Sequence, residues 1–303
     1  MFEIKIPLSV PRDKKTTYLQ NYKMLTAGSG NLFLIAADQK VEHLNADFFG
    51  PGISPEDATP EHIFKIASSA SGAVLASHLG LISRYGQDYK HLPYIVKLNG
   101  KTNLGDNENK NSAPTWWTVA DIVKFKKESG LKIVGVGYTL YLGGQFEDLM
   151  LEAAAKMIFD AHQNGLTAIL WVYPRGKNVK EEDVHIIAGG AGVAASLDAD
   201  FVKVKYPYAL KDKKETALKF KEVTAAAGRT KVICVGGAKQ STKELLAHLN
   251  NQLKFSDTAG LAIGRNLHQR SFDEAKKLAA DISALIFEKA KKPKKMKRLL
   301  GLF

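Results

Sequence analysis

The stretch Leu32-Phe-Leu-Ile-Ala-Ala-Asp38 is a short apolar run that ends on an aspartate. Both alternating sets of its side chains are apolar, which is typical of a strand covered on both faces, as in a parallel sheet. Similar runs follow along the chain at 72–77, 94–98, 133–137, 168–172, 201–205, 232–235 and 261–263. Together they predict eight buried parallel strands.

The stretches between these runs carry apolar residues at helical spacing. They lie at 60–67, 118–127, 146–164, 211–227, 242–250 and 272–288. Strands that alternate with helices in this way predict an α/β fold, a closed (β/α)8 TIM barrel in a single domain. An open doubly wound sheet is the alternative, weakened because no G-x-G-x-x-G follows the first strand. We expect an N-terminal extension over 1–31, the barrel over 32–288 and a basic tail over 289–303.

Composition narrows the class of protein further. The chain has 303 residues, 45% of them hydrophobic, and a single cysteine, Cys234, which excludes a disulfide framework and a multi-cysteine metal site. It has no apolar run of about 18 residues and no visible secretory signal, so we expect a cytoplasmic protein with no membrane partner. More than half of the net charge of +12 lies in 289–303. The remaining body is mildly basic and suits small phosphorylated anions, so nucleic acid is not the partner we expect.

Active sites of TIM barrels lie at the carboxyl ends of the strands, and several predicted strands here end in polar or aromatic side chains. These are Asp38, Lys97, Trp171, Tyr173, Arg175, Lys203 and Lys205. Because side chains alternate along a strand, Trp171 shares a face with Tyr173, and Lys203 shares a face with Lys205. The predicted site therefore combines amines with a phenol.

A lysine between Val202 and Val204 is costly to bury in its charged form. Desolvation and a neighbouring cation both lower the pKa of a lysine, and we expect Lys205 and Arg175 to supply that charge. A neutral amine can attack a ketone and form a Schiff base, an electron sink that permits C–C cleavage without a metal or another cofactor. The structural alternative is a lysine that pairs with Asp38 for stability only.

Two glycine-containing loops follow the last two predicted strands. The seventh strand runs into Gly236 and Gly237, and the eighth into Gly264 and Arg265. Loops at these two positions of a barrel commonly bind phosphate. Glycine lets backbone amides approach an oxyanion, and arginine can donate two hydrogen bonds to it. Although a tight turn also uses paired glycines, the two loops together predict a phosphate site.

The segments Trp171-Val-Tyr-Pro-Arg-Gly176, Ala199-Asp-Phe-Val-Lys203-Val-Lys-Tyr206 and Gly264-Arg-Asn266 resemble the archaeal-type (DhnA-type) class I fructose-bisphosphate aldolase family. The similarity extends over about 32–286. It implies a lyase that reversibly cleaves fructose 1,6-bisphosphate to dihydroxyacetone phosphate and glyceraldehyde 3-phosphate. It also implies a homo-oligomer, a decamer being common in the family, with a small phosphorylated sugar as substrate.

The resemblance also implies roles for individual residues. Lys203 matches the Schiff-base lysine, Tyr173 the acid/base tyrosine and Asp38 the aspartate that closes the first strand. Tyrosine is a weak base at neutral pH, so we expect Arg175 or Lys205 to lower the pKa of Tyr173. The residues expected to contact substrate or its phosphate are Trp171, Arg175, Lys205, Gly236, Gly237, Gly264 and Arg265.

The chain departs from the family pattern at two places. It reads Asp38-Gln39-Lys40 where the family commonly has Asp-His-Gly, and Val235 where a serine often precedes the glycine pair. Two alternatives therefore stay open. One is a transaldolase-like enzyme or 2-keto sugar synthase that uses the same lysine on another phosphorylated sugar. The other is a non-catalytic barrel that binds nucleic acid or a protein partner through its basic tail.

Overall fold

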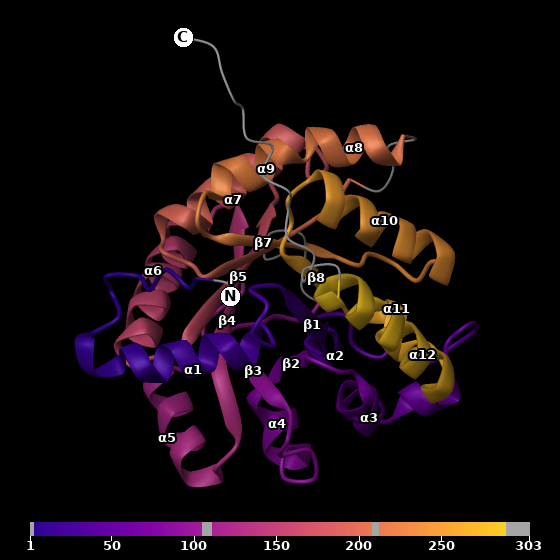
Figure 1. Ribbon diagram of the computed structural model, residues 1–303, viewed down its shortest axis with the longest axis horizontal. Helices are drawn as coiled ribbons and strands as arrows, with labels where there is room; N and C mark the ends of the chain where they lie inside the picture. The colour runs from indigo at the N-terminus through magenta and orange to yellow at the C-terminus, as the bar shows by residue number, and fades with distance from the viewer. Residues whose placement is uncertain (1–2, 105–110, 208–211, 289–303) are drawn as a thin grey trace.

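Eight parallel strands close into a barrel in the computed structural model, which describes residues 3–104, 111–207 and 212–288 (Figure 1). Each strand pairs with the next one in sequence, and the last pairs with the first. The strands are β1 (Leu32–Ala36), β2 (Ala73–His78), β3 (Pro93–Lys97), β4 (Lys132–Leu142), β5 (Thr167–Pro174), β6 (Phe201–Val204), β7 (Lys231–Val235) and β8 (Gly260–Ile263). The predicted TIM barrel is confirmed, and the open-sheet alternative is wrong. The predicted basic tail lies outside the described residues.

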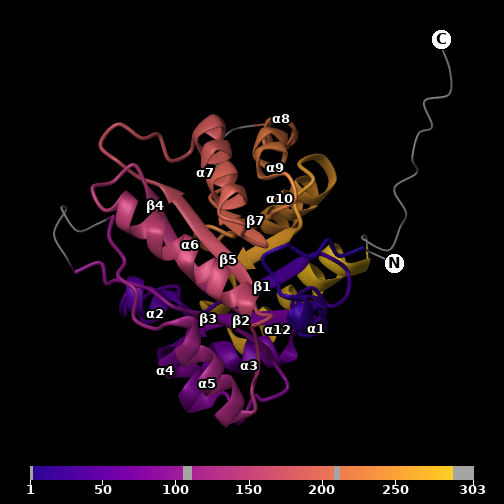
Figure 2. The same cartoon turned by 90° about the vertical axis from the view of Figure 1, so that its left-hand side faces the viewer.

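Helices cover the outside of the barrel, and Figure 2 shows α6 along β4 and β5. They are α1 (Lys15–Leu25), α2 (Gln39–Glu42), α3 (Glu61–Ser69), α4 (Leu79–Tyr85), α5 (Val119–Ser129), α6 (Glu147–Gln163), α7 (Val184–Ser196), α8 (Lys213–Lys219), α9 (Lys221–Ala227), α10 (Thr242–Phe255), α11 (Arg265–His268) and α12 (Phe272–Ser283). Short 3-10 turns form at Arg12–Lys14 and Pro55–Ala58, and a π-helical turn at Ala284–Glu288. The stretch predicted as one helix over 211–227 forms two helices, α8 and α9. Among the described residues, no helix has the length and apolar content needed to cross a bilayer.

The strands bury both of their faces, in two separate cores. Inside the barrel lie side chains such as Leu34, Ile95 and Phe201, whereas their sequence neighbours pack outward against the helices. Because the alternation has a period of two, Lys97 and Lys203 point into the barrel from positions two residues beyond Ile95 and Phe201. The fold therefore places two lysines inside one carboxyl end of the barrel.

The opposite end of the barrel is closed by the segment that precedes β1. Tyr18 and Tyr22 of α1 pack under the interior core, and the Tyr18 hydroxyl donates to the buried Asp200. His162 pairs with Asp200 (3.2 Å) and Asp198 (3.4 Å) beside it. With this end filled, the entrance for a ligand is at the carboxyl ends of the strands.

Candidate active site

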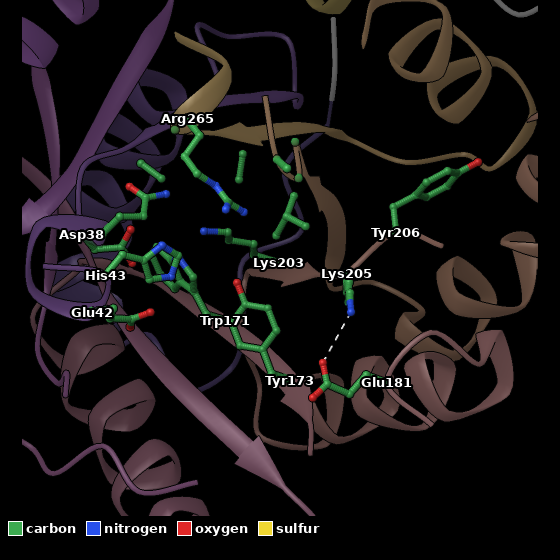
Figure 3. Close-up of a pocket in the computed structure, with 18 of the residues that line it drawn as sticks. Asp38, Glu42, His43, Trp171, Tyr173, Glu181, Lys203, Lys205, Tyr206 and Arg265 are labelled. Carbon is green, nitrogen blue, oxygen red and sulfur yellow. Dashed lines mark hydrogen bonds and ion pairs between the residues drawn. The ribbon is translucent and has the colours of Figure 1, made fainter. Parts of the chain in front are cut away.

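A cavity of about 440 Å³ opens at the carboxyl ends of the strands (Figure 3). Its wall contains the ten residues predicted to be catalytic or to bind substrate: Asp38, Trp171, Tyr173, Arg175, Lys203, Lys205, Gly236, Gly237, Gly264 and Arg265. These residues come from β5 and β6, from the loops after β1, β5, β6, β7 and β8, and from the first position of α11. The structure therefore brings all ten together in one place.

Lys203 projects from β6 into this cavity, and only 4% of the residue is exposed. Burial lowers the pKa of its amine, because the charged form loses hydration. Asp38 and Glu42 oppose this shift, whereas the positive charges of Lys97 and Arg265 add to it. The net effect is a pKa below the ordinary lysine value, so the neutral nucleophilic form is more accessible.

From the sequence we expected Lys205 and Arg175, not Lys97 and Arg265, to lower the pKa of Lys203. Lys205 lies on the wall of the cavity but turns toward Glu181 (3.4 Å) and Glu182 (3.1 Å) (Figure 3). Arg175 also pairs with Glu181, at 3.5 Å. The sequence prediction is corrected here, because Lys97 and Arg265 supply the nearby positive charges that lower the pKa of Lys203.

Lys97 is fully buried at the end of β3 and is the cation that sequence reasoning left without a role. Its ammonium nitrogen lies 3.3 Å from Asp38 and 3.8 Å from Glu42. Burial alone would raise the pKa of Asp38, but Lys97 and Lys203 outweigh it and hold that pKa well below its usual range. The structural alternative for Lys203 was an ion pair with Asp38. In the structure, Lys97 makes that ion pair.

Tyr173 points its hydroxyl into the cavity from the end of β5 (Figure 3). Burial raises its pKa well above the ordinary value, and the negative charges of Glu42 and Asp38 raise it further. The guanidinium of Arg175 lies 5.1 Å from the ring centre and offsets this only in part. The expectation of a lowered tyrosine pKa is wrong, so Tyr173 is a neutral phenol that can donate a proton at neutral pH.

Trp171 both fills the barrel and forms part of the cavity wall. Its ring fits because Gly137 faces it on β4, where an added Cβ would lie 2.2 Å from the indole. The ammonium groups of Lys97 and Lys203 lie 5.0 and 5.2 Å from the indole ring centre, within cation–π range. The indole Nε1 is buried without a hydrogen-bond partner among the described residues, and it is a donor that a ligand could use.

The loops after β7 and β8 form the opposite wall. Gly237 has φ of +71°, a left-handed conformation that favours glycine. A Cβ on Gly264 would lie 2.3 Å from Nε2 of Gln39, so any larger residue at position 264 would push the Gln39 side chain aside. Arg265 extends into the cavity and pairs loosely with Asp47, at 3.8 Å. Glycine backbone and the Arg265 guanidinium thus lie together on this wall, an arrangement that suits a phosphate group.

Asn266 of α11 holds the loop after β7 in place through hydrogen bonds. The sequence alone predicted no function for it. It is fully buried, and its Nδ2 donates to the carbonyl oxygens of Gly236 (3.0 Å) and Ala238 (2.8 Å). Its Oδ1 accepts from the backbone of Gln240, at 2.9 Å. One side chain therefore holds the glycine loop in a fixed shape beside Arg265.

Other residues of the site also escaped the sequence analysis. Glu42, in α2 directly after β1, and Glu181, in the loop after β5, both line the cavity. Lys97 carried a usable signal, since it ends a predicted strand, but the two glutamates lie on loops or short helices where periodicity gives no direction. No cluster of three His, Cys, Asp or Glu side chains in the described part of the chain is arranged to hold a metal ion.

A closed (β/α)8 barrel with a buried lysine of lowered pKa and a tyrosine at the carboxyl ends of its strands is typical of the lysine-dependent aldolase class. Comparison with known proteins gives the particular family. The chain belongs to the DeoC/LacD family of aldolases, whose model matches residues 32–270. The resemblance seen in the sequence is thereby confirmed.

The chain is similar to three proteins that are named as fructose-bisphosphate aldolases. A relative from Methanocaldococcus jannaschii, named fructose-bisphosphate aldolase/6-deoxy-5-ketofructose 1-phosphate synthase, is 50% identical over 287 residues, covering 94% of this chain and 91% of its own. The structure of a fructose-bisphosphate aldolase from Slackia heliotrinireducens is 43% identical with a TM-score of 0.90, covering 95% of this chain and 91% of that one. An archaeal fructose-1,6-bisphosphate aldolase, with its catalytic lysine bound to the carbinolamine intermediate, is 30% identical with a TM-score of 0.75, covering 89% and 99%.

Proposed function

We propose that this protein reversibly cleaves fructose 1,6-bisphosphate to dihydroxyacetone phosphate and glyceraldehyde 3-phosphate, with Lys203 as the Schiff-base nucleophile. The observation that supports this most directly is the amine of Lys203, buried in the cavity with a lowered pKa beside a phenol and a carboxylate. The family and the named activities of its relatives agree with it.

Tyr173 supplies the proton transfers of the proposed reaction. The neutral amine of Lys203 attacks the C2 ketone, and the Tyr173 hydroxyl protonates the carbinolamine oxygen, which leaves as water. The tyrosinate then takes the proton from the C4 hydroxyl while the C3–C4 electron pair moves into the iminium. Glyceraldehyde 3-phosphate departs, Tyr173 returns its proton to C3 of the enamine, and hydrolysis releases dihydroxyacetone phosphate. The raised pKa makes the phenol stable between turnovers and the tyrosinate a strong base.

The remaining residues orient the sugar. Asp38 is held ionised by Lys97, so it can accept hydrogen bonds from substrate hydroxyls. Gly236, Gly264 and Arg265 hold the phosphate next to the ketone, which fixes C2 against the amine.

Borohydride reduction in the presence of dihydroxyacetone phosphate, followed by peptide mass mapping, tests the nucleophile. We expect a stable adduct on Lys203. An adduct on Lys205 instead would refute the assignment. A coupled assay on fructose 1,6-bisphosphate with chelator present tests the reaction itself, and loss of activity with chelator that zinc restores would contradict a Schiff-base mechanism.

A second candidate is a transaldolase-like transfer or 2-keto sugar synthesis, in which the enamine on Lys203 attacks another aldehyde and hydrolysis of the resulting iminium releases the new ketose. It is favoured by the second activity in the name of the Methanocaldococcus jannaschii relative, 6-deoxy-5-ketofructose 1-phosphate synthase. Gln39 and Val235 belong to the two departures from the family pattern, and both line the cavity where they could alter acceptor choice. Product formation that depends on an added acceptor aldehyde distinguishes this transfer from simple cleavage.

We also infer a homo-oligomer, in line with the resemblance. Leu149 and Phe159 of α6 are large apolar side chains that are more than half exposed, as expected of a surface that contacts another copy. Light scattering during gel filtration measures the assembly, and a decamer is the size that the resemblance implies.

A further inference from the structure

A second cavity, of about 610 Å³, lies at the amino end of the barrel. Its walls come from the N-terminal segment 3–9, from α1, from the end of α7, and from the residues that lead into β6 and β7. Ligand pockets commonly have volumes of about 300 to 1,000 Å³, so this cavity is large enough for a small molecule. Phe201 and the rest of the interior core lie between it and Lys203, so a ligand here does not reach the proposed nucleophile.

One part of the wall of this second cavity is apolar. Ile4 and Ile6 of the N-terminal segment pack against the interior core, and Ala199 and Ala227 line the cavity as buried residues. Tyr22 of α1 also lines it, and only 6% of this residue is exposed. The Tyr22 hydroxyl makes no hydrogen bond to any residue that the structure describes. Because buried hydroxyl groups usually have a partner, it is a hydrogen-bonding group that a ligand could use.

The carboxylates on the wall already have partners of their own. Glu3 pairs with Lys5 at 2.7 Å. Asp198 and Asp200 share His162, which lies 3.4 and 3.2 Å away from them. Burial lowers the pKa of His162, but the two aspartates outweigh it and raise the pKa to about 9, so the imidazole is a cation at neutral pH. Glu3 and Lys5 therefore cancel, and the two aspartates with His162 leave one net negative charge.

Arg229 and Lys231 are the other two cations on the wall, and both lie where the chain enters β7. Arg229 is exposed and has no ion pair with a carboxylate in the described part of the chain. These two positive charges exceed the single net negative charge of the aspartate cluster by one. The excess matches a ligand with one negative charge, and a guanidinium can donate two parallel hydrogen bonds to a carboxylate.

We propose that the second cavity is an accessory binding site for a small carboxylate with an apolar or aromatic body. The carboxylate binds Arg229, and the body lies against Ile6 and Tyr22. Such a ligand joins the N-terminal segment to the loop that precedes β7. The proposal is independent of the proposed reaction, because no residue lines both this cavity and the one that contains Lys203.

Calorimetry on the full-length protein at neutral pH tests the site with two probes, 3-phenylpropanoate and its uncharged analogue 3-phenylpropanamide. We expect the wild type to bind the carboxylate about tenfold more tightly than the amide. Arg229→Gln should weaken binding of the carboxylate by about tenfold and leave binding of the amide unchanged. Ala195→Phe, on the cavity wall near the end of α7, occupies part of the cavity and should weaken binding of both probes by about tenfold.

The matched control is Arg12→Gln, because Arg12 is also an exposed arginine but lies outside the cavity wall. It should leave both dissociation constants at the wild-type values. Arg265→Gln should also leave them unchanged, and weaker carboxylate binding there would place the probe in the other cavity and overturn the proposal. Equal carboxylate affinities in Arg229→Gln and Arg12→Gln, unchanged binding in Ala195→Phe, or no saturable carboxylate binding by the wild type would overturn it as well. Thermal melts confirm that each variant is folded.

Discussion

Replacing Lys97 with methionine tests the electrostatics of the site, because it removes a buried charge and keeps a long, flexible side chain. The ammonium of Lys97 lies beside Asp38 and Glu42 and repels the amine of Lys203. In the variant, Lys203 loses a like charge and keeps both carboxylates as counterions. Both conditions raise the pKa of Lys203, so less of its amine is neutral at pH 7.

The size of this pKa shift can be worked out from the positions of Lys97 and Lys203, which both lie near Trp171. The two ammonium nitrogens lie 5.0 and 5.2 Å from the indole ring centre. They are thus at most about 10 Å apart, where two unit charges at an effective dielectric of about 20 repel by about 1.7 kcal/mol. That energy exceeds one pKa unit, so we expect the neutral fraction of Lys203 at pH 7 to fall by at least about tenfold.

The assay is the rate of borohydride trapping of dihydroxyacetone phosphate on Lys203 across a pH series. We expect the rise in rate for Lys97→Met to begin about one pH unit higher than in the wild type, with the two rates converging in alkali. Lys97→Arg keeps the charge and should follow the wild type.

Breaking a buried ion pair costs about 3 to 5 kcal/mol, so denaturant melts must show that each variant is folded. A folded Lys97→Met variant whose rate profile is unshifted, or shifted to lower pH, would refute the reasoning.

Three further changes have defined outcomes. Tyr173→Phe should reduce turnover of fructose 1,6-bisphosphate by about 100- to 10,000-fold in a coupled assay, and a near-normal rate would exclude it as the acid/base group. Gly264→Ala places a Cβ 2.3 Å from Nε2 of Gln39, so we expect KM for the phosphorylated sugar to rise by about tenfold or more, with unchanged KM as the contrary result. Burial lowers the pKa of His162, but its two aspartate partners outweigh this and raise it to about 9. The resulting stability is fully present below about pH 6.5 and is lost as pH rises through about 9, a loss of about 3 kcal/mol in urea melts. His162→Gln should lack this dependence, and an equal loss in the variant would contradict it.

The barrel could be predicted because burial on both faces leaves a direct signature, namely strands in which both alternating sets of side chains are mostly apolar. Helix α7 could not, because Gly189, Gly190 and Gly192 lower its intrinsic helix propensity and the sequence 184–196 shows no polar face. Packing explains Gly190, since a Cβ there would lie 2.9 Å from the side chain of Val172. Close contact between α7 and β5 thus outweighs propensity, and a single sequence does not reveal such contacts.

The position of the site could be predicted, whereas its electrostatics could not. Alternation along β6 places Lys203 inside the barrel, but β6 ends at Val204, so the rule no longer applies to Lys205. Lys205 turns to the carboxylates of the neighbouring loop instead. Lys97 approaches Asp38 from β3 across the barrel interior, and that distance depends on how the strands are staggered around the barrel.

The charges around Lys203 suit the two states that we propose for it, first a neutral nucleophile and then a cationic iminium. The charges that act on its pKa are two positive groups, Lys97 and Arg265, and two negative groups, Asp38 and Glu42. These four charges cancel, so the net charge is zero when the Lys203 amine is neutral. A protonated amine adds an uncompensated positive charge in a buried site, which favours release of the proton before attack. In the proposed reaction, a substrate phosphate on Arg265 then brings negative charge into the same cavity. The iminium therefore forms in a site that the substrate has made more negative, and the substrate itself supplies part of the stabilisation of its own intermediate.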